Sequence, residues 1–364
     1  MEHPENDPKY VGLNVNKGIS QPPAVNPYLN VRKKRQDYSP AEYTDHILKG
    51  NITVLSQAVT LLESQKNEHQ SVAQEIIEKC LPYSGRSIRI GITGVPGAGK
   101  STSIDAFGMY LIRQRQKKLA VLAIDPSSER SKGSILGDKT RMEELSRDPH
   151  AFIRPSPTAG SLGGVARKTR ETIILCEAAG FDTVFVETVG VGQSETAVHS
   201  MVDFFLLIQI SGAGDELQGI KRGIMEMADG IIVNKADGNN IGKANLAAAQ
   251  YRNALQLFPL PASGWTPRVL TYSGYYQIGI GEIWDMIDEY IAFTQSTGYF
   301  DSRRNSQAKY WMYESINEQL KNHFYQSPKI KKELLIKESQ VLRSEVSSFQ
   351  AARQLLTMYF KETK

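Results

Sequence analysis

One glycine-rich stretch of the chain holds the residue types that bind phosphate. GVPGAGKS, residues 94–101, has the spacing G-x-x-x-x-G-K-[ST], follows an apolar run and precedes a helical pattern. Its glycines let the backbone point N–H groups at phosphate oxygens, and the N-terminus of the following helix adds positive potential. We expect Lys100 to reach the β- and γ-phosphates and Ser101 to bind Mg²⁺. The candidate phosphate-binding residues are Gly94, Val95, Pro96, Gly97, Ala98, Gly99, Lys100, Ser101 and Thr102.

A second stretch indicates which base the site would accept. GIIVNKAD, residues 230–237, ends an apolar run with Asn-Lys-x-Asp, the pattern that reads guanine in P-loop GTPases. The Asp237 carboxylate can accept hydrogen bonds from N1–H and the exocyclic amino group of guanine, whereas adenine has no donors arranged that way. We expect Asn234 to tie this loop to the phosphate loop and the stem of Lys235 to cover the base. The alternative is an ordinary helix N-cap at Asp237.

The next apolar run along the chain ends in a candidate third part of the base site. Ser273, Gly274 and Tyr275 follow it, at a place where a Ser-Ala-type loop usually supplies backbone N–H groups to the guanine carbonyl. Gly274 stands where such a loop usually carries alanine. We therefore predict the location of this loop but not its register.

Three acidic residues lie at or near the ends of apolar runs on the phosphate side. Asp125 and Glu187 each end a run, and Asp138 lies in the Ser-, Gly- and Lys-rich stretch 126–140. Carboxylates and hydroxyls are ligands that Mg²⁺ prefers. The predicted metal ligands are Ser101, Asp125, Asp138 and Glu187. We expect the stretch to be ordered by the γ-phosphate, with a plain surface loop as the alternative.

The stretch VFVETVGVGQSE, residues 184–195, predicts a second loop that responds to nucleotide. Nucleotide hydrolases often carry Asp-x-x-Gly at such a place, and here Glu187 takes the position of the aspartate. Gly190 can present its N–H to the γ-phosphate. Gln193 or Glu195 could orient the attacking water, and no spacing argument selects one. The candidate catalytic residues are Lys100, Glu187, Gly190 and Gln193.

These motifs can form one site only if a sheet brings the ends of their strands together, and the sequence predicts such a sheet. Short apolar runs alternate with amphipathic segments, which predicts an α/β fold: a mostly parallel sheet with helices on both faces, of the P-loop type. Ligands bind at the carboxyl ends of such strands. The predicted strands are residues 88–93, 119–125, 151–155, 183–187, 204–210, 230–234 and 268–272.

The ends of the chain predict extensions around this domain. Residues 1–40 are rich in Pro, Asn and Lys and are expected to form an extended arm. Residues 41–82 predict two helices, and the chain from about residue 301 predicts helix throughout, broken near Ser327-Pro328. The expected organisation has an arm (1–40), a helical segment (41–85), a GTPase domain (86–298) and a C-terminal helical dimerisation arm (299–364). A packed cap on the same domain is the alternative for the last part.

Composition excludes several classes of protein. The chain has 364 residues, 40% hydrophobic and 23% charged, with a formal net charge of +4, so it resembles a globular protein with no strong case for nucleic acid. Cys80 and Cys176 form no C-x-x-C pattern, which argues against a disulfide framework or a zinc site. No apolar run is long enough for a membrane span, and the acidic N-terminus resembles neither a signal peptide nor a mitochondrial presequence. We expect a cytoplasmic location.

Taken together, the motifs resemble one family, the MeaB/ArgK-type P-loop GTPases, which include the human methylmalonic aciduria type A protein. The resemblance covers residues 41–330 and, more loosely, the C-terminal helices. The second-loop stretch and GDELQGIKRG are distinctive beyond general P-loop features. The stretches that carry it are GVPGAGKST, AIDPSSERSKGSILGDKTRM, IRPSPTAGSLGGVARKT, ETVGVGQSE, GDELQGIKRGIMEMADGIIVNKAD and GIGEIWDMI.

The resemblance implies a function. Members are G-protein chaperones of adenosylcobalamin-dependent methylmalonyl-CoA mutase and related acyl-CoA mutases, which gate cofactor loading and exchange through GTP binding and hydrolysis. It implies GTP/GDP and Mg²⁺ as ligands and a homodimer assembled through helical extensions. It also implies a third nucleotide-responsive loop at residues 210–221, where Asp215, Gln218 and Lys221 would relay nucleotide state to the mutase. Without the resemblance, that polar stretch is equally a solvated loop before a helix.

Three other functions remain open from the sequence. A nickel-type metallochaperone GTPase shares the general fold, but this chain has six scattered histidines and no paired cysteines. A transport-linked protein kinase, the older label of the family, would transfer phosphate to a protein acceptor. A structural adaptor would bind GTP without hydrolysing it.

Overall fold

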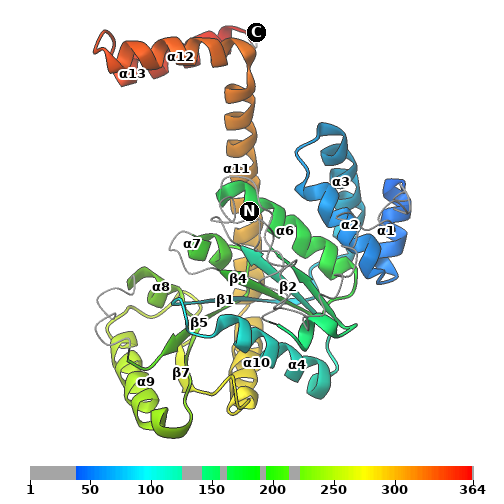
Figure 1. Cartoon of the computed structure of the whole chain (residues 1–364), viewed down its shortest axis with the longest axis vertical. Coiled ribbons are helices and arrows are strands. Elements are labelled where there is room, and N and C mark those ends of the chain that lie inside the picture. Colours follow the sequence, from blue (N-terminus) through cyan, green and yellow to red (C-terminus); the bar gives the residue numbers. More distant parts are fainter. Residues whose placement is uncertain (1–37, 125–141, 156–161, 189–193, 213–221, 363–364) are drawn as a thin grey trace, which may run out of the picture. The chain divides into compact units, whose positions relative to one another are not determined.

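The centre of the molecule, seen here in a computed structural model, is a seven-stranded sheet built from the apolar runs of the sequence (Figure 1). The structure describes residues 38–124, 142–155, 162–188, 194–212 and 222–362. The strands are β1 (Ile88–Gly94), β2 (Leu119–Ile124), β3 (Ala151–Arg154), β4 (Thr183–Thr188), β5 (Phe204–Ile210), β6 (Gly230–Asn234) and β7 (Arg268–Thr271). All seven predicted strands are confirmed, with bounds that differ by one residue at most.

Every pairing within this sheet is parallel, in the order β3-β2-β4-β1-β5-β6-β7. Most strand residues are buried on both faces, which is why the strands are continuous apolar runs without polar alternation. Because the strands are parallel, their carboxyl ends lie at one edge. The phosphate loop and the loop after β7 follow strands at that edge, and Glu187 and the base motif lie at the carboxyl ends of β4 and β6. The predicted fold class is confirmed.

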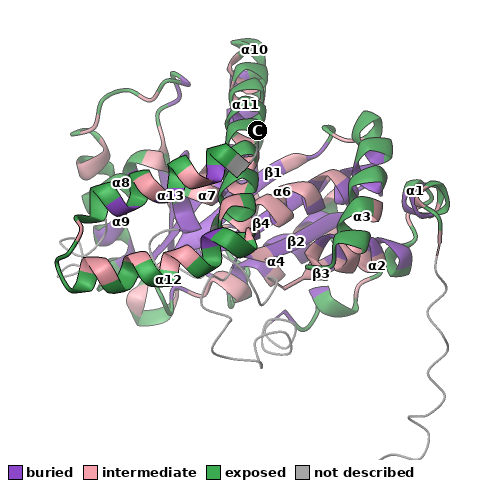
Figure 2. Ribbon diagram, turned by 90° about the horizontal axis from the view of Figure 1, so that it is seen from above, coloured by how far each residue is buried: buried purple, intermediate pink, exposed green. Residues whose placement is uncertain are grey.

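Helices cover both faces of the sheet (Figures 1 and 2). The neighbouring residues Leu206 and Leu207 of β5 point to opposite faces, as strand geometry requires. Leu206 packs with α4 and α10, and Leu207 packs with α8 and α9. The helices around the strands are α4 (Lys100–Arg115), α6 (Leu162–Ala178), α7 (Ser194–His199), α8 (Arg222–Met227), α9 (Ile241–Leu255) and α10 (Ile280–Ser296).

The N-terminal helical segment contains more helices than the sequence predicts. Residues 41–82 predict two helices, and the structure has three, α1 (Pro40–Leu48), α2 (Ile52–Glu63) and α3 (Asn67–Cys80), followed by the short helix η4 (Leu81–Tyr83). The missed break lies at Gly50, whose φ of 74° is left-handed, and at Asn51, whose side chain caps α2. α2 and α3 pack against α6, so this segment lies over the sheet through α6.

Three helices close the chain: α11 (Tyr299–Gln326), α12 (Pro328–Leu342) and α13 (Ser348–Glu362). The break at Ser327-Pro328 is confirmed, since Ser327 caps α12 and Pro328 begins it. The prediction of continuous helix after it is wrong: α12 ends at Leu342, and Ser344 has a left-handed φ of 57°. Figure 1 shows α11 leaving the sheet and leading to α12 and α13. Figure 2 shows that this pair is largely exposed.

Four arginine contacts fix the base of α11 to the sheet. Arg303 bonds to Asp229, and Arg304 bonds to Asp203 and to the carbonyls of Gly85 and Ser87. Asp203 and Asp229 each directly precede a strand, so both pairs lie at the amino-terminal edge of the sheet. The long helix is therefore anchored at the edge opposite the predicted nucleotide site.

The described residues from Ser39 onward form one compact unit. The arm expected at residues 1–40 lies almost entirely outside the described residues. Within the described ranges, no helix is long and apolar enough to cross a membrane. The domain boundaries expected at residues 85 and 298 stay predictions. α10 and α11 meet near the second of them, at Gly298, which has a left-handed φ of 72°.

Candidate nucleotide site

The phosphate loop joins β1 to α4 through backbone that only glycine permits. A Cβ atom on Gly94 would lie 2.2 Å from the carbonyl oxygen of Ile208 on the neighbouring strand. Gly99 has a left-handed φ of 84°, and a Cβ there would lie 2.6 Å from Asn234 Nδ2. The glycines of the motif therefore allow β5 and the base motif to approach the loop closely. α4 begins at Lys100, so its N-terminus faces the loop, as expected.

The side chains of Lys100, Ser101 and Glu187 gather at this loop. Lys100 Nζ donates to the Gly94 carbonyl at 2.9 Å and lies across the loop. Ser101 Oγ lies 3.4 Å from Glu187 Oε1, and Glu187 is 9% exposed. A hydroxyl and a carboxylate side by side are hard oxygen donors that fit Mg²⁺. The structure thus brings together two of the four predicted metal ligands, although Mg²⁺ binding stays a prediction.

Asn234 connects the base motif to the phosphate loop. Its Nδ2 donates to the Ala98 carbonyl at 2.8 Å, and its Oδ1 accepts from the N–H groups of Lys235 and Gly274 at 2.7 and 3.0 Å. Asn234 is 4% exposed, so its bonds are shielded from competing water. The geometry agrees with the tie expected from the sequence and adds a third segment to it, the loop after β7.

Asp237 faces the loop after β7 and does not cap a helix. The short helix η7 (Gly238–Asn240) begins directly after it, but the Asp237 side chain makes no cap hydrogen bond there. Its Oδ2 instead accepts a hydrogen bond of 2.6 Å from Ser273 Oγ. This bond fixes the position of one carboxylate oxygen of Asp237. The carboxylate keeps further lone pairs that can accept hydrogen bonds. The N-cap alternative is therefore not what the side chain does.

The loop after β7 is closed by its own backbone. Ser273 and Ile278 form an antiparallel bridge with N–H···O distances of 3.0 and 3.1 Å. A Cβ on Gly274 would make only ordinary contacts, 3.5 Å from Asn234 Oδ1 at the nearest, so glycine in place of alanine does not alter the loop. Tyr275 itself is 80% exposed.

Several predicted site residues lie outside the described ranges. They are Asp125, Asp138, Gly190, Gln193, Asp215, Gln218 and Lys221. Their roles stay predictions. Glu195, the other candidate for orienting water, lies in the first turn of α7 and is 3% exposed.

The sequence reasoning missed several supporting residues. Thr188 Oγ1 donates to Thr93 Oγ1 at 2.7 Å, which links the ends of β4 and β1. Ser211 donates to Asn240 at 2.8 Å, next to the base motif. The polar residues that directly follow apolar strand ends were the available signal, because such positions meet at one edge of a parallel sheet.

Comparisons with known families and relatives show what this chain is similar to. A family model described as methylmalonyl Co-A mutase-associated GTPase MeaB matches residues 55–329. The chain is 47% identical to the GTPase ArgK of Escherichia coli, over 78% of this chain and 86% of that relative. It is 43% identical to the mouse methylmalonic aciduria type A homolog, mitochondrial, over 90% of this chain and 80% of that relative.

A solved structure is similar across most of the chain. It is described as a LAO/AO transport system kinase, is 38% identical in sequence and gives a TM-score of 0.70. The match covers 88% of this chain and 97% of that one, so it includes helices that precede and follow the sheet in the sequence.

Proposed function

This chain is a GTPase of the MeaB family, and from that premise we propose that it acts as a chaperone of an adenosylcobalamin-dependent acyl-CoA mutase, of the methylmalonyl-CoA mutase type. In this proposal, GTP binding and hydrolysis gate the loading and protection of the mutase cofactor. Support comes from the description of the matching family, which names the mutase, and from the mouse relative, whose name refers to methylmalonic aciduria.

The observation that carries the nucleotide part is the bond between Asn234 and Ala98. It unites a phosphate loop and a guanine motif, 130 or so residues apart in the sequence, in one site. In this proposal Lys100 exchanges its bond with the Gly94 carbonyl for phosphate oxygens, and Asp237 reads the guanine edge. Mg²⁺ would be held by Ser101 and Glu187, and by Asp125 and Asp138 as further candidates, and would neutralise charge on the phosphates.

The catalytic part of the proposal assigns Gly190 to the γ-phosphate and Gln193, with Glu195 as the alternative, to the attacking water. Single-turnover hydrolysis by Glu187→Ala, compared with the wild type, tests the metal-side carboxylate. We expect slower hydrolysis with GDP affinity retained, because Glu187 lies beside Ser101 and away from the base loop. Equal rates would remove Glu187 from catalysis, and no hydrolysis by either protein would favour the adaptor function.

The mutase part is tested by co-purification with an adenosylcobalamin-dependent mutase, with GDP or a non-hydrolysable GTP analogue. We expect the affinity of the complex to differ between the two nucleotides and the GTPase rate to rise when the mutase is present. Lys100→Ala is the control, because it should abolish both effects of nucleotide. An affinity and a rate that do not respond to nucleotide or mutase would contradict the chaperone function.

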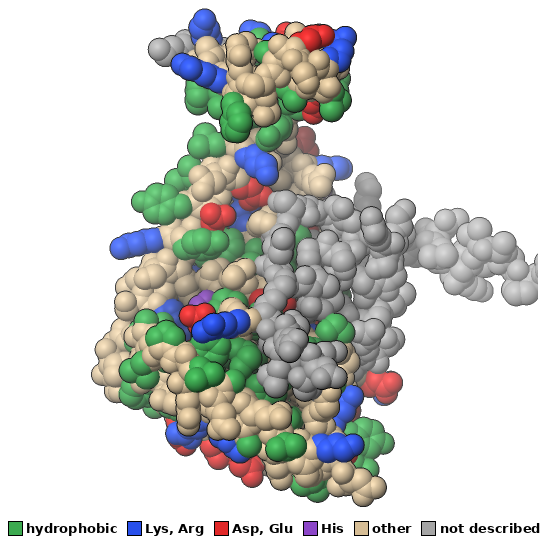
Figure 3. Space-filling view, turned by 90° about the vertical axis from the view of Figure 1, so that its left-hand side faces the viewer, with side chains coloured by type: hydrophobic (Ala, Val, Ile, Leu, Met, Phe, Trp, Pro, Cys, Tyr) green, Lys and Arg blue, Asp and Glu red, His purple; other side chains and the backbone are tan. Residues whose placement is uncertain are grey.

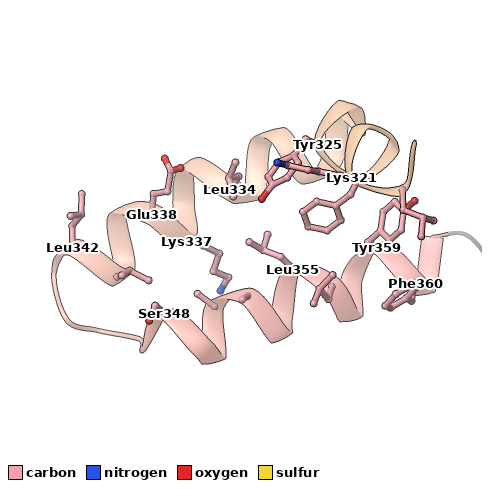
Figure 4. Close-up of a pocket in the computed structure, with 16 residues that line it drawn as sticks. Lys321, Tyr325, Leu334, Lys337, Glu338, Leu342, Ser348, Leu355, Tyr359 and Phe360 are labelled. Carbon is pink, nitrogen blue, oxygen red and sulfur yellow. The ribbon is translucent and has the colours of Figure 1, made fainter. Parts of the chain in front are cut away.

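The C-terminal helices support the proposal of a homodimer. α11, α12 and α13 enclose an apolar groove of about 830 Å³, lined by residues that include Leu334, Leu355 and Tyr359 (Figure 4). Figure 3 shows hydrophobic side chains among the exposed atoms of these helices. An exposed apolar surface of this kind favours protein contact. Leu356 also lines this groove and is 46% exposed. Light scattering should show a dimer for the wild type and a monomer for Leu356→Glu; a monomeric wild type would contradict the proposal.

Two further functions have their own tests. The solved relative is described as a kinase, so a radiolabel assay with γ-labelled GTP distinguishes labelled protein from free phosphate. For nickel insertion, burial raises the pKa of the Cys80 thiol to about 11, which disfavours the thiolate that binds metal. Nickel binding in calorimetry would nevertheless revive that function.

The domain boundaries at residues 40, 85 and 298 and a cytoplasmic location remain part of the proposal. Limited proteolysis that cuts near these boundaries would support the first. Fractionation of the source cells would test the second.

A further inference from the structure

We propose that Asn240 is a positioning residue for guanine recognition and that Ser211 holds Asn240 in place. The inference deepens the GTPase assignment and rests on Asp237 reading the base. Neither residue belongs to the Asn-Lys-x-Asp motif. Their role follows from a chain of hydrogen bonds that joins the end of β5 to the middle of that motif.

The residue that needs positioning is Lys235, the second residue of the motif. Its φ of 60° is left-handed, a conformation that a residue with a side chain keeps only when its surroundings hold it there. Its N–H donates to Asn234 Oδ1 at 2.7 Å, and its carbonyl accepts from Asn240 Nδ2 at 2.6 Å. Asn240 therefore completes the bonds that hold the backbone of Lys235 on both sides.

The orientation of the Asn240 amide is itself determined by its neighbours. A carbonyl only accepts hydrogen bonds, so the NH₂ group must face Lys235, which leaves Oδ1 to accept from Ser211 Oγ at 2.8 Å. Ser211 directly follows β5, and Ile210 of that strand is in register with Asn234 of β6. The second bond thus ties Asn240 to the strand beside the motif.

The Asn240 side chain does not cap α9, which is the usual role of an asparagine directly before a helix. Both ends of the amide are instead committed to Lys235 and Ser211. Asn239, its neighbour, is exposed and supplies a matched control.

The consequence concerns base discrimination more than hydrolysis. Asp237 lies two residues after Lys235, so relaxation of Lys235 would move the carboxylate that reads N1–H and the exocyclic amino group. Inosine nucleotides lack that amino group, so the ratio of the IDP and GDP dissociation constants reports how well Asp237 is placed. A general loss of stability would weaken the binding of both nucleotides by the same factor and leave this ratio unchanged.

The test measures dissociation constants for GDP and IDP, by competition with a fluorescent guanine nucleotide, in the full-length protein. We expect Asn240→Ala and Asn240→Asp to weaken GDP binding about threefold to tenfold, because both remove the donor to Lys235. Both should also lower the ratio of the IDP dissociation constant to the GDP dissociation constant. Ser211→Ala should give a smaller change of the same kind, and Ser211→Thr should restore the wild-type ratio. Asn239→Ala should leave both constants unchanged.

Two outcomes would overturn the inference, and they are distinguishable. If the wild type prefers GDP to ADP but the Asn240 variants keep the wild-type IDP/GDP ratio, Asn240 is not a positioning residue, while the guanine assignment stands. If the wild type binds ADP as well as GDP, the guanine assignment fails and the inference fails with it. Thermal unfolding of each variant separates a misfolded protein from a misplaced carboxylate.

Discussion

Asn234 donates a hydrogen bond of 2.8 Å from its side chain to the carbonyl oxygen of Ala98. The first residue ends β6 and begins the base motif, and the second belongs to the phosphate loop after β1. β5 lies between β1 and β6 in the sheet, so this contact passes over the carboxyl end of β5. We therefore expect the placement of the base to depend on the placement of the phosphates.

Replacing this asparagine should weaken nucleotide binding strongly. Asn234→Ala removes three hydrogen bonds, to Ala98, Lys235 and Gly274. At about 0.5–1.5 kcal/mol for each bond, partly compensated by water, we expect the GDP dissociation constant to rise on the order of 10- to 100-fold. Titration calorimetry with GDP measures it, with the exposed Asn253→Ala as control. Wild-type affinity in Asn234→Ala would show that the tie does not support the site.

The base preference should change in a defined direction when Asp237 becomes an amide. A carboxylate accepts from both guanine donors, whereas an amide offers one donor and one acceptor and suits xanthine, which carries a carbonyl in place of the amino group. Asp237→Asn should therefore bind XDP more tightly than GDP, reversing the wild-type order. Ser273 Oγ keeps a partner at residue 237 in the variant, so the loop should remain closed. Competition binding with both nucleotides checks it, and an unchanged preference for GDP would mean that another group reads the base.

The sequence predicted the strands and the two nucleotide motifs because each of them has a local signal. Buried parallel strands are continuous apolar runs, and glycines with a lysine at fixed spacing need only their own neighbours to form a phosphate loop. The helix breaks at Gly50 and Ser344 were missed, since a left-handed residue between two amphipathic patterns leaves little trace in the periodicity. Ser211 carried the signal of a polar residue after an apolar strand, but its contact with Asn240 had no local signal. It depends on β5 and β6 being neighbours, which the order of strands along the chain does not determine.

The anchor of α11 should contribute more to stability than the exposed ion pairs. The Arg304–Asp203 pair is buried, with 16% and 1% of the two side chains exposed, and Arg304 also donates to the carbonyls of Gly85 and Ser87. Arg304→Ala leaves the Asp203 carboxylate without its ion partner, so we expect a loss of about 3–5 kcal/mol in the free energy of unfolding. Arg268→Ala breaks the exposed Arg268–Glu289 pair and should cost less than about 1 kcal/mol. Urea unfolding compares them, and equal losses would contradict the anchor.

Partly buried His199 should make the folded state sensitive to mild acid. Its ring packs against Phe205 with centroids 5.6 Å apart, and burial, together with the charge of Arg303, lowers the pKa of His199 to about 4. The unfolded chain, with a histidine pKa near 6.5, therefore binds more protons between these values. Stability is fully present above about pH 6.5 and falls as the pH drops towards 4, by on the order of 1.4 kcal/mol per pH unit within that window.

The measurement is the free energy of unfolding at pH 7, 6 and 5 for the wild type and for His199→Gln. The variant has no proton to bind at this position, so its stability should fall less between pH 7 and 5 than that of the wild type. His150→Gln, at an exposed histidine, is the control for the chemical change itself. Carboxylates that neither substitution touches contribute equally to the wild type and to His199→Gln and cancel in the difference between their slopes. If His199→Gln and the wild type lose stability in parallel, another group is responsible for the acid sensitivity of the folded state.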